Sequence, residues 1–375
     1  MSRLADLINE LCPDGVEKRP LGELLSYEQP TRYLVSSKNY DPSFSTPVLT
    51  AGATFLLGFT SETHGIYPAS KNDPVIIFDD FTTASKWVDF PFKLKSSAAK
   101  ILTLADPDKV DIRFLYYLMQ GIRYEPTSHA RHWISVFSKM PVFCPPLEVQ
   151  HEIVKILDQF TRLEAELEAE LEARRAQYEY YRNQLLSYDA LASRGPVEWI
   201  KLKDIVSMRA GSSITSKDIA TVADSSHVYP CYGANGIRGY ISAVTNRDNA
   251  SIIGRQGALS GNISFAEAPF FATEHAVVVT PKVKLVLRWL YHTLIVAELS
   301  KYVTKSAQPG LSVRRLEQVE VLFPSIEEQQ RIADILDRFD ALVNDISSGL
   351  PAEIAARRAQ YEYYRDRLLS FPEKK

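Results

Sequence analysis

The chain has 375 residues, of which 45% are hydrophobic and 24% charged, and its formal net charge is −3. This length predicts two domains, and no stretch approaches the ~18 consecutive apolar residues that a membrane helix needs. The start of the chain lacks the apolar core of a secretory signal, and the three cysteines fit no metal-ligand spacing. We therefore expect a cytoplasmic protein with reduced thiols and no membrane partner.

In chain order, the first predicted segment is a globular domain over residues 1–146. It contains strand-like runs at 74–81 and 99–104 and one amphipathic helix near 111–121. The second predicted segment is 147–188. From Leu147 to Ser187 it has no glycine or proline, and its apolar residues recur at spacings of four and three. That spacing is typical of a coiled-coil helix, here roughly 60 Å long.

A second globular domain is predicted over 189–323, followed by a second long helical segment over 324–375. The second domain has strand-like runs at 250–257 and 275–280 and an amphipathic helix near 284–299. It carries 15 basic and 11 acidic residues, although the whole chain is acidic. Both domains mix strands with helices, so the predicted fold class is α/β (α+β), with two domains joined by two long helices.

The two halves of the chain repeat each other. ARRAQYEYYR at 173–182 recurs unchanged at 356–365, and QHEIVKILDQF at 150–160 resembles QQRIADILDRF at 329–339. The offset between copies grows from 179 to 183 residues, so the second helix has four extra residues near Ser347–Leu350. We expect a pseudo-two-fold tandem repeat whose long helices bury their apolar stripes in an antiparallel coiled coil.

Proline interrupts only the second helix. Gly349 and Pro351 lie within its apolar pattern. Proline lacks a backbone N–H, so it either kinks a helix or occupies the first turn of a new one. We therefore expect a kink or a new helix at Pro351.

Sequence motifs for catalysis are absent. The chain has no phosphate-binding loop of the GxxxxGK[ST] type, no HExxH zinc motif and no [DN]PP[YF] run of the amino-methyltransferases. His129 and His132 in HARHW have no neighbouring cysteine or glutamate cluster. We predict that the chain has no catalytic residue, no metal and no cofactor of its own.

The combination of repeats and loop motifs resembles one known family, the specificity subunits of type I restriction-modification enzymes. Each half ends in PxxExQ–IxxILD–F followed by ARRAQYEYYRxxLLS, and the resemblance covers essentially the whole chain. The loop stretches that carry it include TPVLTAGATFLLGF (46–59), RHWISVFSKM (131–140), YPCYGANGIRGY (229–240), SIIGRQGALSG (251–261) and SAQPGLSV (306–313).

The resemblance implies a non-catalytic protein that binds double-stranded DNA. Each recognition domain would read one half of a bipartite site, and the helices would set the spacer between the halves. The implied partners are two methyltransferase subunits and ATP-dependent restriction/translocase subunits, which would hold S-adenosylmethionine, ATP and Mg²⁺.

Base readout needs short polar or cationic side chains on loops that glycines allow to approach the grooves. The second domain offers four such loops, and Arg255 is the leading candidate because arginine can pair with guanine through two hydrogen bonds; its alternative role is an ion pair that holds the Gly254–Gly257 turn. The candidates in the second domain are Ser212, Ser213, Thr215, Lys217, Asn235, Arg238, Arg255, Gln256, Lys305, Ser306 and Gln308. Those in the first domain are Thr31, Arg32, Thr50, Thr54, Lys86, His129, Arg131 and His132.

The duplicated decapeptide has two interpretations. It either packs the two long helices together or binds two copies of a partner subunit, and its many tyrosines favour a partner surface. The residues concerned are Arg174, Arg175, Tyr178, Tyr181, Arg357, Arg358, Tyr361 and Tyr364.

Two other functions compete with DNA recognition. One is a coiled-coil adaptor whose globular domains bind protein. The other is a nuclease, for which Asp79 and Asp80 in FDDF are the suggestive carboxylates.

Overall fold

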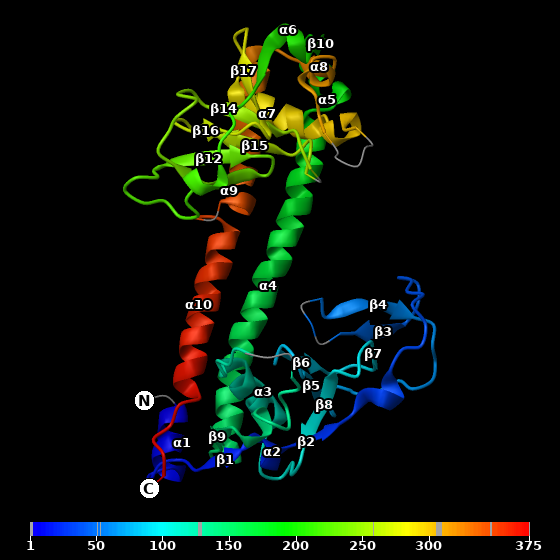
Figure 1. Cartoon of the computed structure of the whole chain (residues 1–375), viewed down its shortest axis with the longest axis vertical. Helices are drawn as coiled ribbons and strands as arrows, with labels where there is room; N and C mark the ends of the chain where they lie inside the picture. The colour runs from blue at the N-terminus through cyan, green and yellow to red at the C-terminus, as the bar shows by residue number, and fades with distance from the viewer. Residues whose placement is uncertain are drawn as a thin grey trace. The chain divides into compact units, whose positions relative to one another are not determined.

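The computed structural model describes residues 3–50, 52, 54–126, 130–257, 259–304, 310–345 and 347–374. The chain divides into two compact units. Unit 1 comprises Met1–Leu167 and Ile354–Lys375, and unit 2 comprises Glu168–Glu353. The long helix α4 (Leu147–Leu185) therefore contributes its first half to unit 1 and its second half to unit 2 (Figure 1). The predicted domain boundaries at 146, 188 and 323 remain a prediction, because the contacts group each sheet domain with parts of the long helices.

The described residues of unit 1 form three small sheets, and the amphipathic helix α3 (Ile112–Gly121) packs against the four-stranded one. The sheets have the strand orders β2-β8-β5-β6, β4-β3-β7 and β1-β9. The elements of its globular part are α1 (Arg3–Leu11), β1 (Lys18–Pro20), α2 (Leu21–Leu24), β2 (Leu25–Glu28), η1 (Pro30–Tyr33), β3 (Thr46–Leu49), β4 (Leu56–Thr60), β5 (Val75–Asp79), β6 (Ser85–Val88), β7 (Lys93–Leu94), β8 (Ala99–Leu104), α3 (Ile112–Gly121), η2 (Phe137–Lys139) and β9 (Pro141–Phe143).

Unit 2 repeats this arrangement. Its sheets have the orders β11-β17-β14-β15, β13-β12-β16 and β10-β18. The elements after α4 in this unit are α5 (Tyr188–Ala192), β10 (Glu198–Lys201), α6 (Leu202–Ile205), β11 (Val206–Ala210), η3 (Ser216–Asp218), β12 (Tyr229–Gly233), β13 (Gly236–Ile241), β14 (Ala250–Gly254), β15 (Ile263–Ala266), β16 (Phe271–Ala272), β17 (Ala276–Pro281), α7 (Leu287–Val296), η4 (Leu299–Tyr302), α8 (Val313–Leu316), β18 (Glu320–Phe323) and α9 (Ile326–Asn344). The last helix, α10 (Leu350–Leu368), belongs to unit 1 from Ile354 onward.

The two sheet systems have the same topology, strand for strand. In each unit the four-stranded sheet is antiparallel throughout, and the three-stranded sheet combines one antiparallel with one parallel pairing. The predicted α/β tandem repeat, with two domains joined by long helices, is therefore confirmed.

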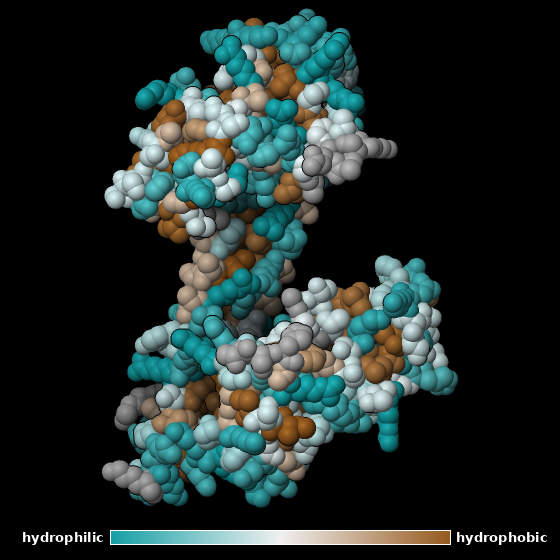
Figure 2. Space-filling model, in the orientation of Figure 1, coloured by the Kyte–Doolittle hydropathy of each residue, from teal (hydrophilic) through white to brown (hydrophobic). Residues whose placement is uncertain are grey.

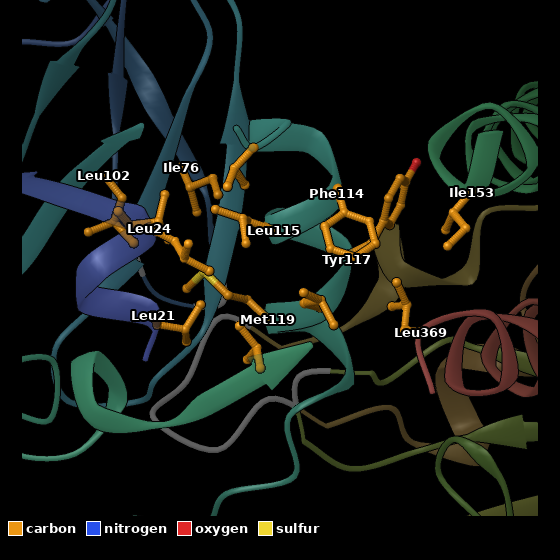
Figure 3. Close-up of a cluster of buried hydrophobic side chains, with 14 of the residues drawn as sticks. Leu21, Leu24, Ile76, Leu102, Phe114, Leu115, Tyr117, Met119, Ile153 and Leu369 are labelled. Atoms are coloured by element: carbon orange, nitrogen blue, oxygen red, sulfur yellow. The ribbon is translucent and has the colours of Figure 1, made fainter. Parts of the chain in front are cut away.

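The core of unit 1 lies around helix α3. Asp111 caps the helix by accepting hydrogen bonds from the backbone N–H groups of Arg113 and Phe114. Figure 3 shows Leu115 of α3 among side chains of the sheet and α2, and Tyr117 on the side that faces Ile153 of α4. The helix thus packs against the sheet and against the long helix at the same time.

The second long helical segment is broken where the sequence predicted. α9 ends at Asn344 and α10 begins at Leu350, with Pro351 in its first turn. A Cβ atom at Gly349 would lie 2.6 Å from the carbonyl oxygen of Ala341, so this close return of the chain requires glycine. The helix α4 has no such break between Leu147 and Leu185.

Candidate nucleic-acid interface

The fold of unit 2 brings the predicted reading loops together. The guanidinium Nη2 of Arg238 donates a hydrogen bond to Ser216 Oγ at 2.7 Å, which joins the β12–β13 hairpin to the loop after β11. Asn262 Nδ2 donates to Asn235 Oδ1 at 2.9 Å, which joins the same hairpin to the loop after β14. These contacts form a continuous surface from loops that are distant in sequence.

The loop after β14 also contacts the segment beyond η4. The backbone N–H of Leu311 donates to the carbonyl of Arg255 at 2.8 Å. Ser212, Ser213, Thr215, Lys217 and Gln256 are exposed on the neighbouring loops. Lys305, Ser306 and Gln308 lie outside the described residues, as does His129 in unit 1.

Arg255 is half-buried at the end of β14. Its backbone N–H donates to the carbonyl of His275 at 3.0 Å, so the strand pairing holds its main chain. Within the described ranges its buried Nε has no hydrogen-bond partner and its guanidinium makes no ion pair. The alternative role, an ion pair that holds the Gly254–Gly257 turn, is therefore not seen in this part of the chain. An unpaired buried donor is costly, so a ligand acceptor at this position would be favourable.

In unit 1 the candidates are spread over four places. Thr31 and Arg32 are exposed on η1, and Lys86 is half-buried in β6. Arg131 is exposed in the loop between α3 and η2. The hydroxyl of Thr50 donates to the carbonyl of Thr54 at 2.5 Å, which closes the turn between β3 and β4. Thr50 therefore shapes the hairpin.

His132 is a core residue, which corrects its prediction as a surface contact. Its side chain is 4% exposed, and its Nδ1 lies 3.2 Å from the hydroxyl of Tyr124. Its backbone N–H donates to the carbonyl of Asp80 at 2.9 Å. A side chain in this place supports the loop and does not reach a DNA groove.

The carboxylates of FDDF also have structural partners. Asp80 is buried beside Lys100, with 3.1 Å between Oδ2 and Nζ, and its Oδ1 accepts the backbone N–H of Trp133 at 2.8 Å. Asp79 Oδ1 accepts the backbone N–H of Phe81 at 2.9 Å and shapes the turn after β5. Asp80 is neutralised by Lys100, and Asp79 holds a turn, so both carboxylates have structural roles. These residues therefore do not support a nuclease site.

One buried glutamine anchors each globular domain to its long helix, a role that sequence reasoning missed. In unit 1, Gln150 Oε1 accepts the backbone N–H of Asp111 at 2.9 Å, and its Nε2 donates to the carbonyl of Pro145 at 2.7 Å. In unit 2, Gln329 accepts from Val286 at 3.0 Å and donates to the carbonyl of Pro324 at 3.0 Å. The identical position of the glutamine in both copies of the QxxI motif was the available signal.

A charged cluster adds a second attachment in each unit. Arg113 Nε lies 2.9 Å from Asp158 Oδ1, and the Tyr117 hydroxyl donates to the same carboxylate. The corresponding group in unit 2 consists of Arg288, Asp337 and His292.

In unit 2, Arg288 Nε and His292 Nε2 lie 2.7 and 2.8 Å from Asp337 Oδ1. Burial lowers the pKa of His292, and the hydrogen bond to Asp337 opposes that effect. Burial also raises the pKa of Tyr178, whose hydroxyl lies 3.1 Å from His292 Nδ1. The cluster therefore joins α7, α9 and α4 within unit 2.

The duplicated decapeptide packs the long helices together within each unit. Tyr178 and Tyr181 of α4 stack on Phe339 of α9, with ring centroids 6.3 and 5.5 Å apart. Tyr361 and Tyr364 of α10 lie against Phe160 of α4 at 6.4 and 5.5 Å. The self-packing interpretation therefore holds for these four tyrosines.

The arginines of the decapeptide pair with helix residues and two further tyrosines face solvent. Arg174 and Arg175 lie 2.7 and 3.1 Å from carboxylate oxygens of Glu170 and Glu172, and Arg358 lies 2.5 Å from Glu164. Arg357 donates to Gln360 at 3.2 Å. Tyr180 and Tyr363 are 62% and 59% exposed, more than Tyr181 and Tyr364 at 37% and 38%, so each decapeptide keeps aromatic surface outside the helix packing.

The family described as "Type I restriction modification DNA specificity domain" matches residues 13–173 and 195–356. The EcoR124I/EcoR124II specificity subunit of Escherichia coli is 42% identical over 394 residues, and the match covers 96% of each chain. The chain belongs to the type I restriction-modification specificity subunits. The Escherichia coli EcoprrI specificity subunit is 43% identical over 257 residues, which cover 64% of each chain.

Solved structures support the fold of this specificity subunit. The S subunit of a type I restriction-modification system from M. genitalium has a TM-score of 0.62 at 18% identity, with 94% of this chain and 96% of that chain covered. A chain from a study of assembly and conformational transition in the type I R-M system has a TM-score of 0.55 at 16% identity, with 96% and 98% covered.

The family identification establishes the general function. The chain is a non-catalytic subunit with two DNA specificity domains, and it works with DNA and with other subunits of a restriction-modification system. None of the helices that the structure describes is long and apolar enough to cross a membrane. Among the same residues, no three histidine, cysteine, aspartate or glutamate side chains are grouped as metal ligands.

Proposed function

We propose that the two units each read one half of a bipartite DNA site, and that the long helices set the spacer between the halves. Two methyltransferase subunits and the restriction/translocase subunits would be the partners in the cytoplasm. They would hold the S-adenosylmethionine, ATP and Mg²⁺ on which catalysis depends.

The observation that best supports this proposal is that the two units share one scaffold but differ in their loops. Both units have the same strand order and the same glutamine anchor, at Gln150 and Gln329. The residues on the equivalent loops differ, as Asp80 and Arg255 illustrate at the end of β5 and β14. A repeated rigid support with divergent loops fits two readers of different sequences.

The side chains on the unit 2 loops suit two kinds of DNA contact. Lys217 and Arg238 are exposed cations, which can bind phosphate oxygens or base edges. Arg255 presents an unpaired Nε next to a turn in which Gly257 has φ of +84°, a conformation that favours glycine. Arginine in such a loop can donate two hydrogen bonds to the O6 and N7 atoms of guanine.

The two decapeptides support a partner that binds twice. In each, the most exposed tyrosine is Tyr180 or Tyr363, and its neighbours Tyr181 and Tyr364 pack on a phenylalanine while remaining partly exposed. Exposed tyrosines are enriched at protein interfaces. Two identical helical surfaces would suit two copies of one methyltransferase subunit.

The proposal is tested with the assembled methyltransferase complex. Methylated adenines are mapped in a genome that carries the complex, and binding to the deduced site is measured at several salt concentrations. The expected result is two specific half-sites with a spacer of fixed length, and affinity that falls as salt rises. Binding without sequence preference, or protein binding in place of DNA binding, would favour the adaptor alternative.

A further inference from the structure

The hairpins β3–β4 and β12–β13 occupy the same position in the two units. β3 pairs with β4 and β7 as β12 pairs with β13 and β16. The partner pairs Val48–Gly58 and Cys231–Gly239 correspond, as do Leu49–Leu56 and Tyr232–Ile237. Each residue of the β3–β4 hairpin that forms one of these pairs therefore has an equivalent residue in the β12–β13 hairpin.

Each hairpin has a β-bulge at the same point. The register shifts between Val48 and Leu49 in unit 1, which leaves Leu57 without a partner across the strand pair. In unit 2 the shift leaves Arg238 without a partner. A bulge turns the extra side chain away from the regular sheet and is common beside functional sites. Leu57 and Arg238 are thus equivalent residues with re-aimed side chains.

Close packing fixes the residue that follows each bulge. A Cβ atom at Gly239 would lie 2.4 Å from the carbonyl oxygen of Ala220, and one at Gly58 would lie 2.9 Å from Tyr40 Cβ. Real Cβ atoms do not approach other atoms so closely, so both sites require glycine. The bulge is consequently held in a defined place in both units, and the side chain it presents is the variable part.

The side chains at the two bulges differ in chemistry. In unit 2, Ile237 is 53% exposed and Arg238 is held by Ser216 Oγ at 2.7 Å. In unit 1 both residues are leucine, with Leu56 47% and Leu57 38% exposed. Leu56 and Leu57 are absent from the two hydrophobic clusters that the described residues of unit 1 form. Figure 2 shows hydrophobic surface over the β3–β4 hairpin, bordered by hydrophilic residues.

We propose that the bulged residue of each hairpin determines specificity, and that Leu57, with Leu56, contacts a thymine methyl group while Arg238 contacts a guanine. This inference rests on the proposed function, since it assigns one position in each half-site. In the major groove only thymine presents a methyl group, and guanine presents two acceptors that arginine can pair with. The half-site read by unit 1 therefore contains a T·A pair, and that read by unit 2 contains a G·C pair.

The test uses the full chain in its methyltransferase complex and duplexes that carry the mapped site. In the unit 1 half-site each thymine is replaced in turn by uracil, which lacks only the methyl group. One replacement is expected to weaken wild-type binding about fourfold, the effect of about one buried methyl group. In a Leu56→Ala, Leu57→Ala double variant, uracil and thymine should bind equally. Leu57→Met should retain the preference for thymine.

The unit 2 half-site is tested with 7-deazaguanine, which lacks the N7 acceptor. One replacement should weaken wild-type binding about tenfold and should have no further effect on Arg238→Ala. Leu11→Ala removes a leucine that is also partly exposed, but on α1, and should bind every duplex as the wild type does. Thermal unfolding of each variant shows whether it is folded.

The outcomes separate this inference from the proposed function. A bipartite site that contains no thymine in one half, or whose thymines can all be replaced by uracil without loss, would overturn the role of Leu57. A uracil effect that persists in the alanine double variant would overturn it too. Absence of any bipartite site for the wild-type complex would overturn both the inference and the proposed function.

Discussion

Phe160 of α4 stacks on Tyr364 of α10, with ring centroids 5.5 Å apart and planes at 26°. The second copy of the repeat makes the same contact, since Phe339 stacks on Tyr181 at 5.5 Å and 29°. In each unit the phenylalanine from one copy of the ILDxF motif meets the decapeptide from the other copy. The identity of the two decapeptides is therefore explained in part by a packing role performed twice.

Truncation of Phe339 is expected to destabilise the protein. Phe339→Ala removes a half-buried ring that contacts both Tyr178 and Tyr181, so the free energy of unfolding should fall by about 2 kcal/mol. Urea denaturation measures this value. Tyr180→Ala, which removes an exposed ring from the same decapeptide, should change it by less than about 0.5 kcal/mol. Equal losses in the two variants would contradict the packing role.

The glutamine anchor gives a second stability prediction. Gln329→Leu keeps the size of the side chain but leaves the N–H of Val286 and the carbonyl of Pro324 without their buried partner. We expect a loss of about 2 kcal/mol in urea denaturation. Gln330→Leu changes the exposed neighbour, whose side chain bonds Asp334 on the helix surface, and should cost about 0.5 kcal/mol or less. A Gln329→Leu protein as stable as wild type would rule out the anchor.

Protonation of His292 should couple stability to pH. Burial lowers the pKa of the folded His292 below its usual value of about 6.5. As pH falls through about 6.5, the unfolded chain gains a proton that the folded protein does not take up, so the free energy of unfolding decreases. His292→Gln should reduce this decrease between pH 7 and pH 5. A variant whose stability falls as steeply as that of the wild type would show that His292 does not contribute.

The repeated four-residue unit of α4 predicts a change in spacer length. Leu163–Arg174 reads LEAE-LEAE-LEAR. Deletion of Leu167–Glu170 shortens an α-helix by about 6 Å and rotates it by only about 40° beyond a full turn. At about 3.4 Å per base pair, the preferred spacer should shorten by one or two base pairs while both half-sites persist. Methylation mapping of the variant decides this, and an unchanged spacer in an active complex would exclude the helix as the ruler.

The architecture could be predicted from the sequence because the repeat and the spacing of apolar residues along the long helices are visible without any tertiary contact. The exact decapeptide repeat, the unbroken helix from Leu147 and the break at Pro351 each depend on local residue types. The strand-like run predicted at 99–104 coincides with β8, and the run predicted at 250–257 contains β14, which ends at Gly254. By contrast, the shared sheet topology was hidden, because the domains repeat only faintly in sequence.

The candidate site was less predictable, because tertiary contacts decide which polar side chains face solvent. His132 lies in a polar loop by sequence, yet its bonds to Asp80 and Tyr124 bury it. The bulge that presents Leu57 and Arg238 depends on strand pairing that no local pattern reveals. Arg255, in a glycine-rich turn after an apolar strand, was placed at the loop surface from sequence and lies half-buried at its edge.

The central claim, that each unit reads its own half-site, is tested most directly by methylation mapping of an Arg255→Ala complex. The guanidinium of Arg255 belongs to the loops of unit 2 and has a buried Nε without a partner among the described residues. Loss of its base contact should cost about 1–3 kcal/mol at one half-site. The account predicts that one half-site becomes degenerate while the other half-site and the spacer stay as in wild type. Loss of preference at both halves by a folded, assembled complex would contradict it.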